Sequence, residues 1–143
     1  MEKQTVGYVI KCVQYTLRQN LDESLGAIGL TAPQYSAMRE LEREPGSSNA
    51  ELARAGFVTP QTMIKILQIL KKAGYIRREA HPRHGRIQTT ALTSEGRQLM
   101  AEANRRVETI ETRMAAGLTA EERQTLKGLL SRCFTNLTGD ELP

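Results

Sequence analysis

Apolar residues recur every three or four positions through most of this chain of 143 residues, which is the spacing of amphipathic helices. At Val6, Ile10, Val13 and Leu17 this spacing predicts a first helix over about residues 5–26. The same reasoning predicts five further helices: from 31 to just before Pro45, from 48 to about Gly56, over about 60–73, over about 94–116, and from 119 onward.

Residues that favour helix ends mark the limits of these segments. Three segments place a hydroxyl residue three positions before Gln or Glu, which is the pattern of a capping box. These are Thr31-Ala-Pro-Gln34, Ser48-Asn-Ala-Glu51 and Thr119-Ala-Glu-Glu122. Thr59-Pro60 and Thr93 are further expected starts, whereas Gly74 and Gly117 are expected stops.

Between the fourth and fifth helices the pattern changes to one typical of strands. Residues 75–79 and 86–92 are rich in β-prone side chains, and a loop with Pro and Gly at 80–85 separates them. We therefore expect an antiparallel hairpin with a basic tip. The predicted fold is mainly α with a small β-hairpin, in the order four helices, hairpin, two helices.

The helix over 60–73 has two different faces. Met63, Ile66, Leu67 and Leu70 form an apolar stripe suited to a core. Gln61, Lys65, Gln68 and Lys72 form a polar stripe along about three turns. We expect this second stripe to face solvent or a polar partner.

Positive charge is concentrated around this helix and the hairpin. Of the chain's 20 basic and 16 acidic residues, eight basic ones and one acid lie between Leu52 and Ala91, so this stretch carries +7 and the remainder −3. The bases are Arg54, Lys65, Lys71, Lys72, Arg77, Arg78, Arg83 and Arg86, and the acid is Glu79. Charge gathered in this way is equally compatible with a polyanionic partner and with a solvated basic face. The pattern of helices and hairpin beneath the charge favours the polyanionic partner.

The order of helix, short helix, polar-faced helix and basic hairpin is that of a winged helix-turn-helix. In that arrangement the polar-faced helix, here the one over about 60–73, enters the major groove of double-stranded DNA, and its N-terminal side chains approach base edges. Arginine at a hairpin tip suits the narrow, electronegative minor groove. The residues expected to contact DNA are Thr59, Gln61, Thr62, Lys65, Gln68, Arg83, His84 and Arg86. For Thr59 a purely structural role as a helix cap is equally compatible with the pattern.

Six segments in order resemble the MarR-type winged-helix transcriptional regulators. They are Leu30-Thr-Ala-Pro-Gln-Tyr35, Asn49-Ala-Glu-Leu-Ala53, Val58-Thr-Pro-Gln-Thr62, Leu70-Lys-Lys-Ala-Gly-Tyr-Ile-Arg77, Leu92-Thr-Ser-Glu-Gly96 and Gly117-Leu-Thr-Ala-Glu-Glu122. Each is weak alone, but together and at these spacings they are specific, and they span nearly the whole chain.

The resemblance implies one domain over 1–143 that acts as a homodimer. Residues 31–92 would form the DNA-binding lobe, and residues 1–30 and 93–143 would supply the dimerisation helices. It also implies a pseudo-palindromic operator and a repressor released by a small ligand, often phenolic or aromatic. No cofactor is implied.

The wing departs from the family pattern at one position. Where the family usually reads Asp-x-Arg-x-x-Arg, this chain has His81-Pro-Arg83-His-Gly-Arg86. Both arginines are kept, but the acid that would be expected to hold an arginine is replaced by histidine. A neutral imidazole is a weaker acceptor and a cationic one would repel arginine. We therefore expect histidine to weaken the order of the wing and the usual geometry of its arginines.

A ligand pocket, by location in the family, is expected between the dimerisation and DNA-binding lobes. Tyr8, Cys12, Tyr15, Tyr35 and Met38 are the residues expected to line it, with Arg18 or Arg39 nearby. Tyrosine and methionine stripes are more often core, and this alternative stays open.

Cys12 also resembles, in its helix, the reactive cysteine of the family's hydroperoxide sensors. Those sensors place it more than a turn further upstream, so we favour a structural, packed role for Cys12, and more strongly for Cys133. A thiol-based redox sensor is therefore an alternative function.

Other classes of function find less support in the residues. His81 and His84 lack a third ligand nearby, so a metal site is not expected, and no nucleophile–base pair or glycine-rich phosphate loop suggests an enzyme. The chain has no apolar run of membrane-spanning length and no secretory signal at Met1-Glu-Lys-Gln4, so we expect a cytoplasmic protein. A protein-interaction module that keeps the fold without an operator is the remaining alternative.

Overall fold

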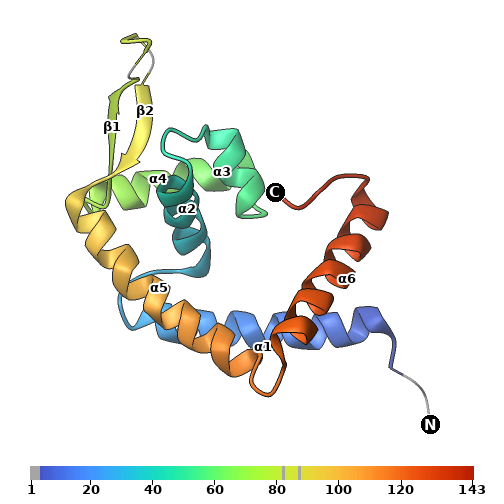
Figure 1. Ribbon diagram of the computed structural model, residues 1–143. Coiled ribbons are helices and arrows are strands. Elements are labelled where there is room, and N and C mark those ends of the chain that lie inside the picture. Colours follow the sequence, from blue (N-terminus) through green and yellow to red (C-terminus); the bar gives the residue numbers. More distant parts are fainter. Residues whose placement is uncertain (1–3, 82, 87) are drawn as a thin grey trace. The chain divides into compact units, whose positions relative to one another are not determined.

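The computed structural model describes residues 4–81, 83–86 and 88–143, and its elements follow the predicted order (Figure 1). The elements are α1 (Val6–Gly26), α2 (Ala32–Arg43), α3 (Asn49–Ala55), α4 (Pro60–Lys72), β1 (Ile76–Ala80), β2 (Gln88–Leu92), α5 (Ser94–Met114) and α6 (Ala120–Thr138). The chain divides into two compact units, Met1–Ile110 and Glu111–Pro143, and each is described by itself.

Two of the three predicted capping boxes are complete. At α2 the Gln34 amide N donates to Thr31 Oγ1 at 3.2 Å, and the Thr31 amide N donates to Gln34 Oε1 at 3.1 Å. Thr119 and Glu122 form the equivalent pair at α6. These local bonds satisfy backbone donors that a helix start leaves open, which is why the starts could be predicted.

The third predicted capping box is only partly formed. The Ser48 hydroxyl accepts from the Glu51 amide N at 3.1 Å, as expected. The Glu51 carboxylate, however, accepts from the Ser48 hydroxyl at 3.0 Å, and this contact takes the place of the expected bond to the Ser48 amide N. The helix still begins at Asn49, because the cap alone supplies the needed acceptor.

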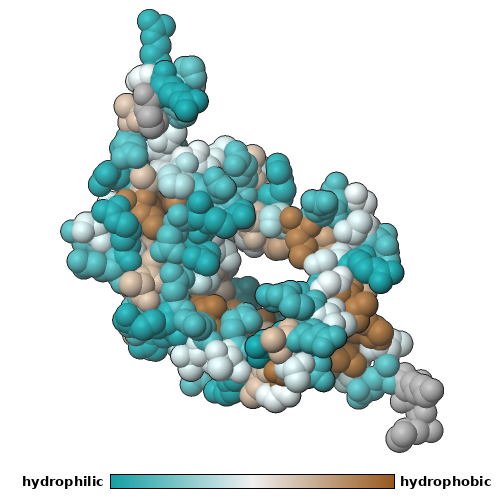
Figure 2. Space-filling model, viewed as in Figure 1, coloured by the Kyte–Doolittle hydropathy of each residue, from teal (hydrophilic) through white to brown (hydrophobic). Residues whose placement is uncertain are grey.

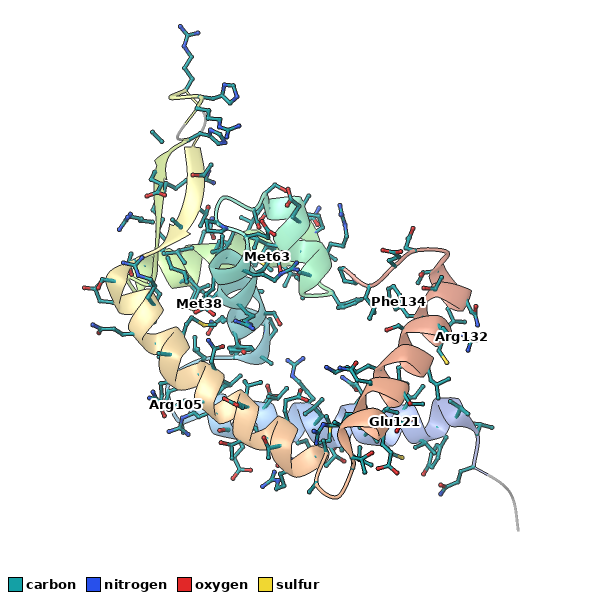
Figure 3. All side chains as sticks on the ribbon, viewed as in Figure 1. Met38, Met63, Arg105, Glu121, Arg132 and Phe134 are labelled. Carbon is teal, nitrogen blue, oxygen red and sulfur yellow. The ribbon has the colours of Figure 1, made fainter. Side chains whose placement is uncertain are left out.

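The core of the first unit lies where α2, α3 and α4 pack on one another, with β2 against α2 and β1 against α4. Met38 from α2 and Met63 from α4 are fully buried and point into this core (Figure 3). The buried cluster also includes Leu25 of α1 and Met100 and Ala103 of α5. It therefore extends beyond residues 31–92, into both segments assigned from the sequence to dimerisation.

The hairpin is a two-stranded antiparallel sheet in which Ile76 pairs with Leu92 and Arg78 with Thr90. Ile76, Thr90 and Leu92 are buried at the base of the hairpin, whereas most of β1 is exposed. The base is thus held by the core, and the hairpin projects away from the helices (Figure 1).

Thr93 joins the hairpin to the ends of α4 and α5. Its hydroxyl donates to the Gly74 carbonyl at 2.6 Å and accepts from the Gly96 amide N at 3.0 Å. A side chain at Gly96 would place its Cβ 2.1 Å from the Tyr75 carbonyl oxygen, so only glycine allows this approach. These contacts fix where the hairpin leaves the body relative to α4.

In the second unit, α6 contains no buried residue. The predicted apolar stripe is present, but Leu126, Leu129 and Leu130 remain about half exposed. Apolar side chains that reach the surface are drawn in brown in Figure 2. The stripe is thus built as predicted, and nothing in the second unit buries it.

Candidate nucleic-acid interface

The N-terminus of α4 is fixed by its own threonines. Thr59 Oγ1 accepts from the Thr62 amide N at 3.1 Å, and the Thr59 hydroxyl donates to Thr62 Oγ1 at 3.0 Å. Pro60 occupies the first helical turn, where its missing amide hydrogen costs nothing. The structural role of Thr59 as a cap is confirmed, and both threonines remain exposed at the end of the helix.

A short turn between α3 and α4 sets the direction of α4. The Gly56 and Val58 amides donate to the carbonyls of Leu52 and Ala53 at 3.0 and 3.1 Å. Phe57 takes the left-handed conformation with φ 53°, which is unfavourable for a bulky residue and is retained because the turn requires it. Sequence reasoning placed the stop near Gly56 but gave no signal that the left-handed residue is Phe57.

Asn49 provides a second link between these helices. Its side-chain Nδ2 donates to the Pro60 carbonyl at 3.4 Å, so the start of α3 is tied to the start of α4. The two helices of the helix-turn-helix are therefore held by backbone and side-chain bonds that do not use the outer face of α4.

The two predicted faces of α4 are confirmed by burial. Met63, Ile66 and Leu70 are buried, while all four members of the polar stripe are exposed. Those four are Gln61, Lys65, Gln68 and Lys72. Their amides and ammonium groups are thus presented on one side of a helix whose other side is anchored in the core.

The wing places its basic side chains in solvent. Arg83, His84 and Arg86 are exposed at the tip, which is coloured predominantly as hydrophilic in Figure 2. Neither arginine forms an ion pair with any of the described residues. Pro82 and Ile87 lie outside the described residues. The two arginines predicted to enter a minor groove are therefore presented without an internal partner that would compete with phosphate.

His81 replaces the missing acid in an unexpected way. Its Nδ1 accepts a hydrogen bond from the Arg83 amide N at 3.0 Å, and its ring centroid lies 5.2 Å from that of His84. The imidazole is half-buried, and its Nδ1 accepts from the backbone of the turn. The expectation that histidine weakens the wing rested on a contact to an arginine side chain, whereas the observed bond holds the backbone of the turn.

The eight basic residues of the +7 stretch are all exposed. Arg77 pairs with Glu79 Oε2 at 3.2 Å across an exposed surface, and such pairs are screened and weak. The remaining seven have no ion pair within the described part of the chain. Their charge is therefore available to an external anion.

The residues expected to line a ligand pocket do not share one surface of the single chain. Met38 is fully buried in the core, while Tyr8, Cys12 and Tyr15 are exposed on α1. Tyr35 is half-buried and donates its hydroxyl to Asn104 Oδ1 of α5 at 2.9 Å. The assignment of these five residues to a pocket stays a prediction.

The two nearby arginines have local carboxylate partners. Arg18 pairs with Asp22 at 3.0 Å, and Arg39 pairs with Glu42 Oε1 at 2.8 Å. Glu42 Oε1 also accepts from Asn104 Nδ2 at 3.0 Å, so Tyr35, Asn104, Glu42 and Arg39 form one network between α2 and α5. Sequence reasoning missed Asn104, because its partners are more than 60 residues away along the chain.

Both cysteines are exposed in the single chain, which contradicts the packed role expected for them. They lie on α1 and α6, and several apolar residues of these two helices are exposed as well. Whether Cys12 senses oxidants stays a hypothesis.

The described residues hold neither a cluster of metal ligands nor a membrane-spanning helix. No three His, Cys, Asp or Glu side chains among residues 4–81, 83–86 and 88–143 come together as metal ligands would. Within the same ranges, no helix combines the length and the apolar character that crossing a bilayer requires.

A capped helix with a polar outer face, anchored beside a basic hairpin, defines a winged helix-turn-helix protein. Comparison with known proteins gives the family. A model described as "MarR family" matches residues 28–87. An HTH-type transcriptional repressor of Mycobacterium tuberculosis, Rv2887, is 37% identical over 127 residues, which is 89% of this chain and 91% of the relative.

Solved structures agree with the sequence comparison. The M. tuberculosis MarR family protein Rv2887 in complex with salicylic acid matches with a TM-score of 0.75 and 36% identity, over 92% of this chain and 98% of the other. The same protein in complex with DNA matches with a TM-score of 0.72 and 34% identity, over the same shares. This chain therefore belongs to the MarR family of transcriptional regulators.

Proposed function

We propose that this protein is a transcriptional repressor that binds a pseudo-palindromic operator as a homodimer and leaves it when a small aromatic acid binds. The observation that carries the proposal is the exposed polar and basic face of α4 beside a wing whose two arginines pair with no carboxylate among the described residues. The relative Rv2887 is named a repressor and has been crystallised with DNA, which supports the same role here.

In this proposal residues 31–92 read DNA and the terminal helices bring two copies together. Apolar residues exposed on α1 and α6 would each be covered in the dimer. Two-fold symmetry would then place two α4 helices in successive major grooves about 34–36 Å apart. The repressor works by occupying chromosomal DNA, so it would act in the cytoplasm and needs no catalysis.

The DNA-binding part of the proposal is tested by fluorescence anisotropy against the DNA that flanks the protein's own gene, with a scrambled duplex as control. We expect tight binding to the native fragment, at least about a hundredfold weaker binding to the scrambled one, and an affinity that falls steeply with salt. Equal, weak binding to both duplexes would contradict sequence-specific binding and favour the interaction-module alternative.

The contribution of Lys65 can be separated in the same assay. If its ammonium group contacts phosphate, Lys65→Ala should reduce the slope of log K against log salt by about one. If Lys65 reads a base, the slope should hardly change while the preferred sequence shifts. A variant that matches the wild type in slope and sequence preference would remove Lys65 from the interface.

The ligand part of the proposal draws on the salicylic acid complex of Rv2887. Tyr35 is the predicted pocket residue that connects to both α2 and α5, through Asn104. An acid that engages Tyr35 would disturb that network and so bias the position of the DNA-binding helices.

Salicylate should therefore release the protein from the native fragment, whereas salicyl alcohol, which lacks the carboxylate, should be much less effective. Tyr35→Phe should need a higher salicylate concentration for release while binding the fragment normally without salicylate. Equal release by the acid and the alcohol would contradict recognition of the carboxylate.

A further inference from the structure

The outer face of α4 contains an apolar residue that the polar stripe does not account for. Ile64 is 48% exposed and lies one turn after Gln61 and one turn before Gln68. Helix geometry places side chains three and four positions apart next to one another. The exposed isoleucine is therefore flanked on both sides by glutamine amides.

The packing of α4 does not need an apolar residue at this position. Met63, Ile66 and Leu70 bury the inner face, and Leu67 packs partly against the same cluster. An exposed apolar side chain alone carries no function, because such residues are common on protein surfaces. What distinguishes Ile64 is its place within a polar and basic face near the beginning of the helix.

The chemistry of the major groove gives such a residue a use. Glutamine can bond to the N6 and N7 atoms of adenine, and the thymine paired with that adenine presents its C5-methyl group in the same groove. An aliphatic side chain beside a glutamine is placed to pack on that methyl. Neither cytosine nor uracil offers an equivalent group.

We propose that Ile64 is a specificity-determining residue that reads a thymine C5-methyl group, next to an adenine bound by Gln61. This inference rests on the proposed function, since it requires that α4 enters the major groove. The methyl contact would strengthen the preference for an A·T pair that the glutamine amide already supplies.

The chain offers a matched control on the same helix. Ile69 is 55% exposed, similar to Ile64, but it lies five residues further on, toward the C-terminal end of α4. Side chains near the N-terminus of a recognition helix approach base edges, whereas those near its C-terminus move away from them. Ile69→Ala therefore removes a comparable apolar surface outside the expected contact.

The test uses a duplex that the full-length protein selects from a randomised DNA library. Each thymine is then replaced, symmetrically in both half-sites, by deoxyuridine, which lacks only the methyl group. Dissociation constants are measured by anisotropy for the wild type, Ile64→Ala and Ile69→Ala. Circular dichroism checks that both variants keep the wild-type helix content and melting temperature.

For the wild type and Ile69→Ala, one thymine position should be sensitive, with a loss of about fourfold per methyl and about fifteenfold for both half-sites. Ile64→Ala should bind the thymine and deoxyuridine duplexes equally. If no thymine is sensitive in the wild type, or if sensitivity persists in Ile64→Ala, the proposal is wrong while DNA binding stands. Failure to select any sequence would overturn the proposed function and this inference together.

Discussion

The DNA-binding part of the chain and its terminal helices use the same apolar periodicity with different results. In α2 and α4 the apolar stripe is buried within the chain, with Met38 and Met63 fully enclosed. In α6 the stripe is as regular, yet Leu129 is 51% exposed and Leu130 42%. A periodic stripe therefore predicts a helix and its apolar face, but it does not tell whether the same chain or a second one covers that face.

The first half of α1 resembles α6, because its apolar side chains are also exposed. Val6, Val9, Ile10 and Val13 are all exposed, whereas Leu25 near its end belongs to the core. Burial of large aliphatic side chains stabilises by about 1.5–3 kcal/mol each, so leaving several in water is unfavourable. We infer that the DNA-binding part is completed by its own chain and the terminal helices by a second copy.

The largest effect is expected from charges on the stripe of α6. Leu129→Glu combined with Leu130→Glu should raise the dimer dissociation constant by roughly a thousandfold or more, since four buried leucines are lost per dimer. Light scattering after size exclusion gives the mass, and anisotropy should show that operator binding is lost as well. Gln124→Glu, on the opposite side of the same helix, is the control. A dimeric double variant would contradict the assignment of α6.

A cavity in the core should instead destabilise each chain. Met63→Ala removes a fully buried side chain and should lower the free energy of unfolding by about 2–5 kcal/mol. Gln68→Ala, exposed on the same helix, should change it by less than about 0.5 kcal/mol. Urea denaturation of each variant measures both. If the loss from Met63→Ala disappeared at high protein concentration, the core would not be complete within one chain.

The wing should affect DNA binding without affecting assembly. Arg86→Ala should weaken operator binding by about 1–3 kcal/mol and leave the dimer and its melting temperature unchanged. Arg105→Ala on α5 removes the same charge from a residue paired with Glu102 and is the matched control. Equal affinities for the two variants would show that charge, rather than the position of the wing arginine, determines binding.

The smallest effect concerns a polar link between α5 and α1. Hydrogen bonding and charge from Arg105, with a further contribution from Arg106, hold the pKa of Glu102 below its usual value. Arg106 in turn donates to the Ser24 carbonyl at 3.2 Å. Because the folded-state pKa is lowered, the ionised Glu102 stabilises the fold above its ordinary pKa, and this contribution is lost as the pH falls.

Glu102→Gln should therefore melt slightly below the wild type at pH 7. The difference should shrink as the pH falls through the lowered pKa of Glu102, because protonation then makes the wild-type side chain neutral as well. Thermal melts across this range measure the difference, with Glu108→Gln on the same helix as the control. A difference that is independent of pH would show that the carboxylate charge is not what matters.

Features set by neighbours in the sequence could be predicted, because they depend on local bonds. The caps at Thr31 and Thr119, the Pro60 start of α4 and the presence of the hairpin are of this kind, although its strands begin one or two residues later than predicted. The polar face of α4 also followed from spacing alone, and its burial pattern agrees.

Features that depend on distant residues could not be predicted. The bond between Tyr35 and Asn104 joins residues 69 positions apart, and the exposure of Cys12 and Cys133 depends on what covers their helices. His81 lies between these two cases. Its partner Arg83 is close in sequence, but the His81 ring accepts from the Arg83 backbone amide and not from the Arg83 side chain that the sequence pattern suggested. Ile64 left a signal, an apolar residue outside the stripe, whose meaning depends on the structure.

The most direct test of the central claim compares three duplexes: the selected operator, the same operator with five base pairs inserted at its centre, and a single half-site. The insertion rotates one half-site by about half a turn of the helix, so a symmetric dimer could not place both α4 helices in the major groove. We predict that the intact operator binds one dimer and that the other two duplexes bind at least about a hundredfold more weakly. A half-site that binds as tightly as the full operator would contradict the account, because it would show that one chain suffices to read DNA.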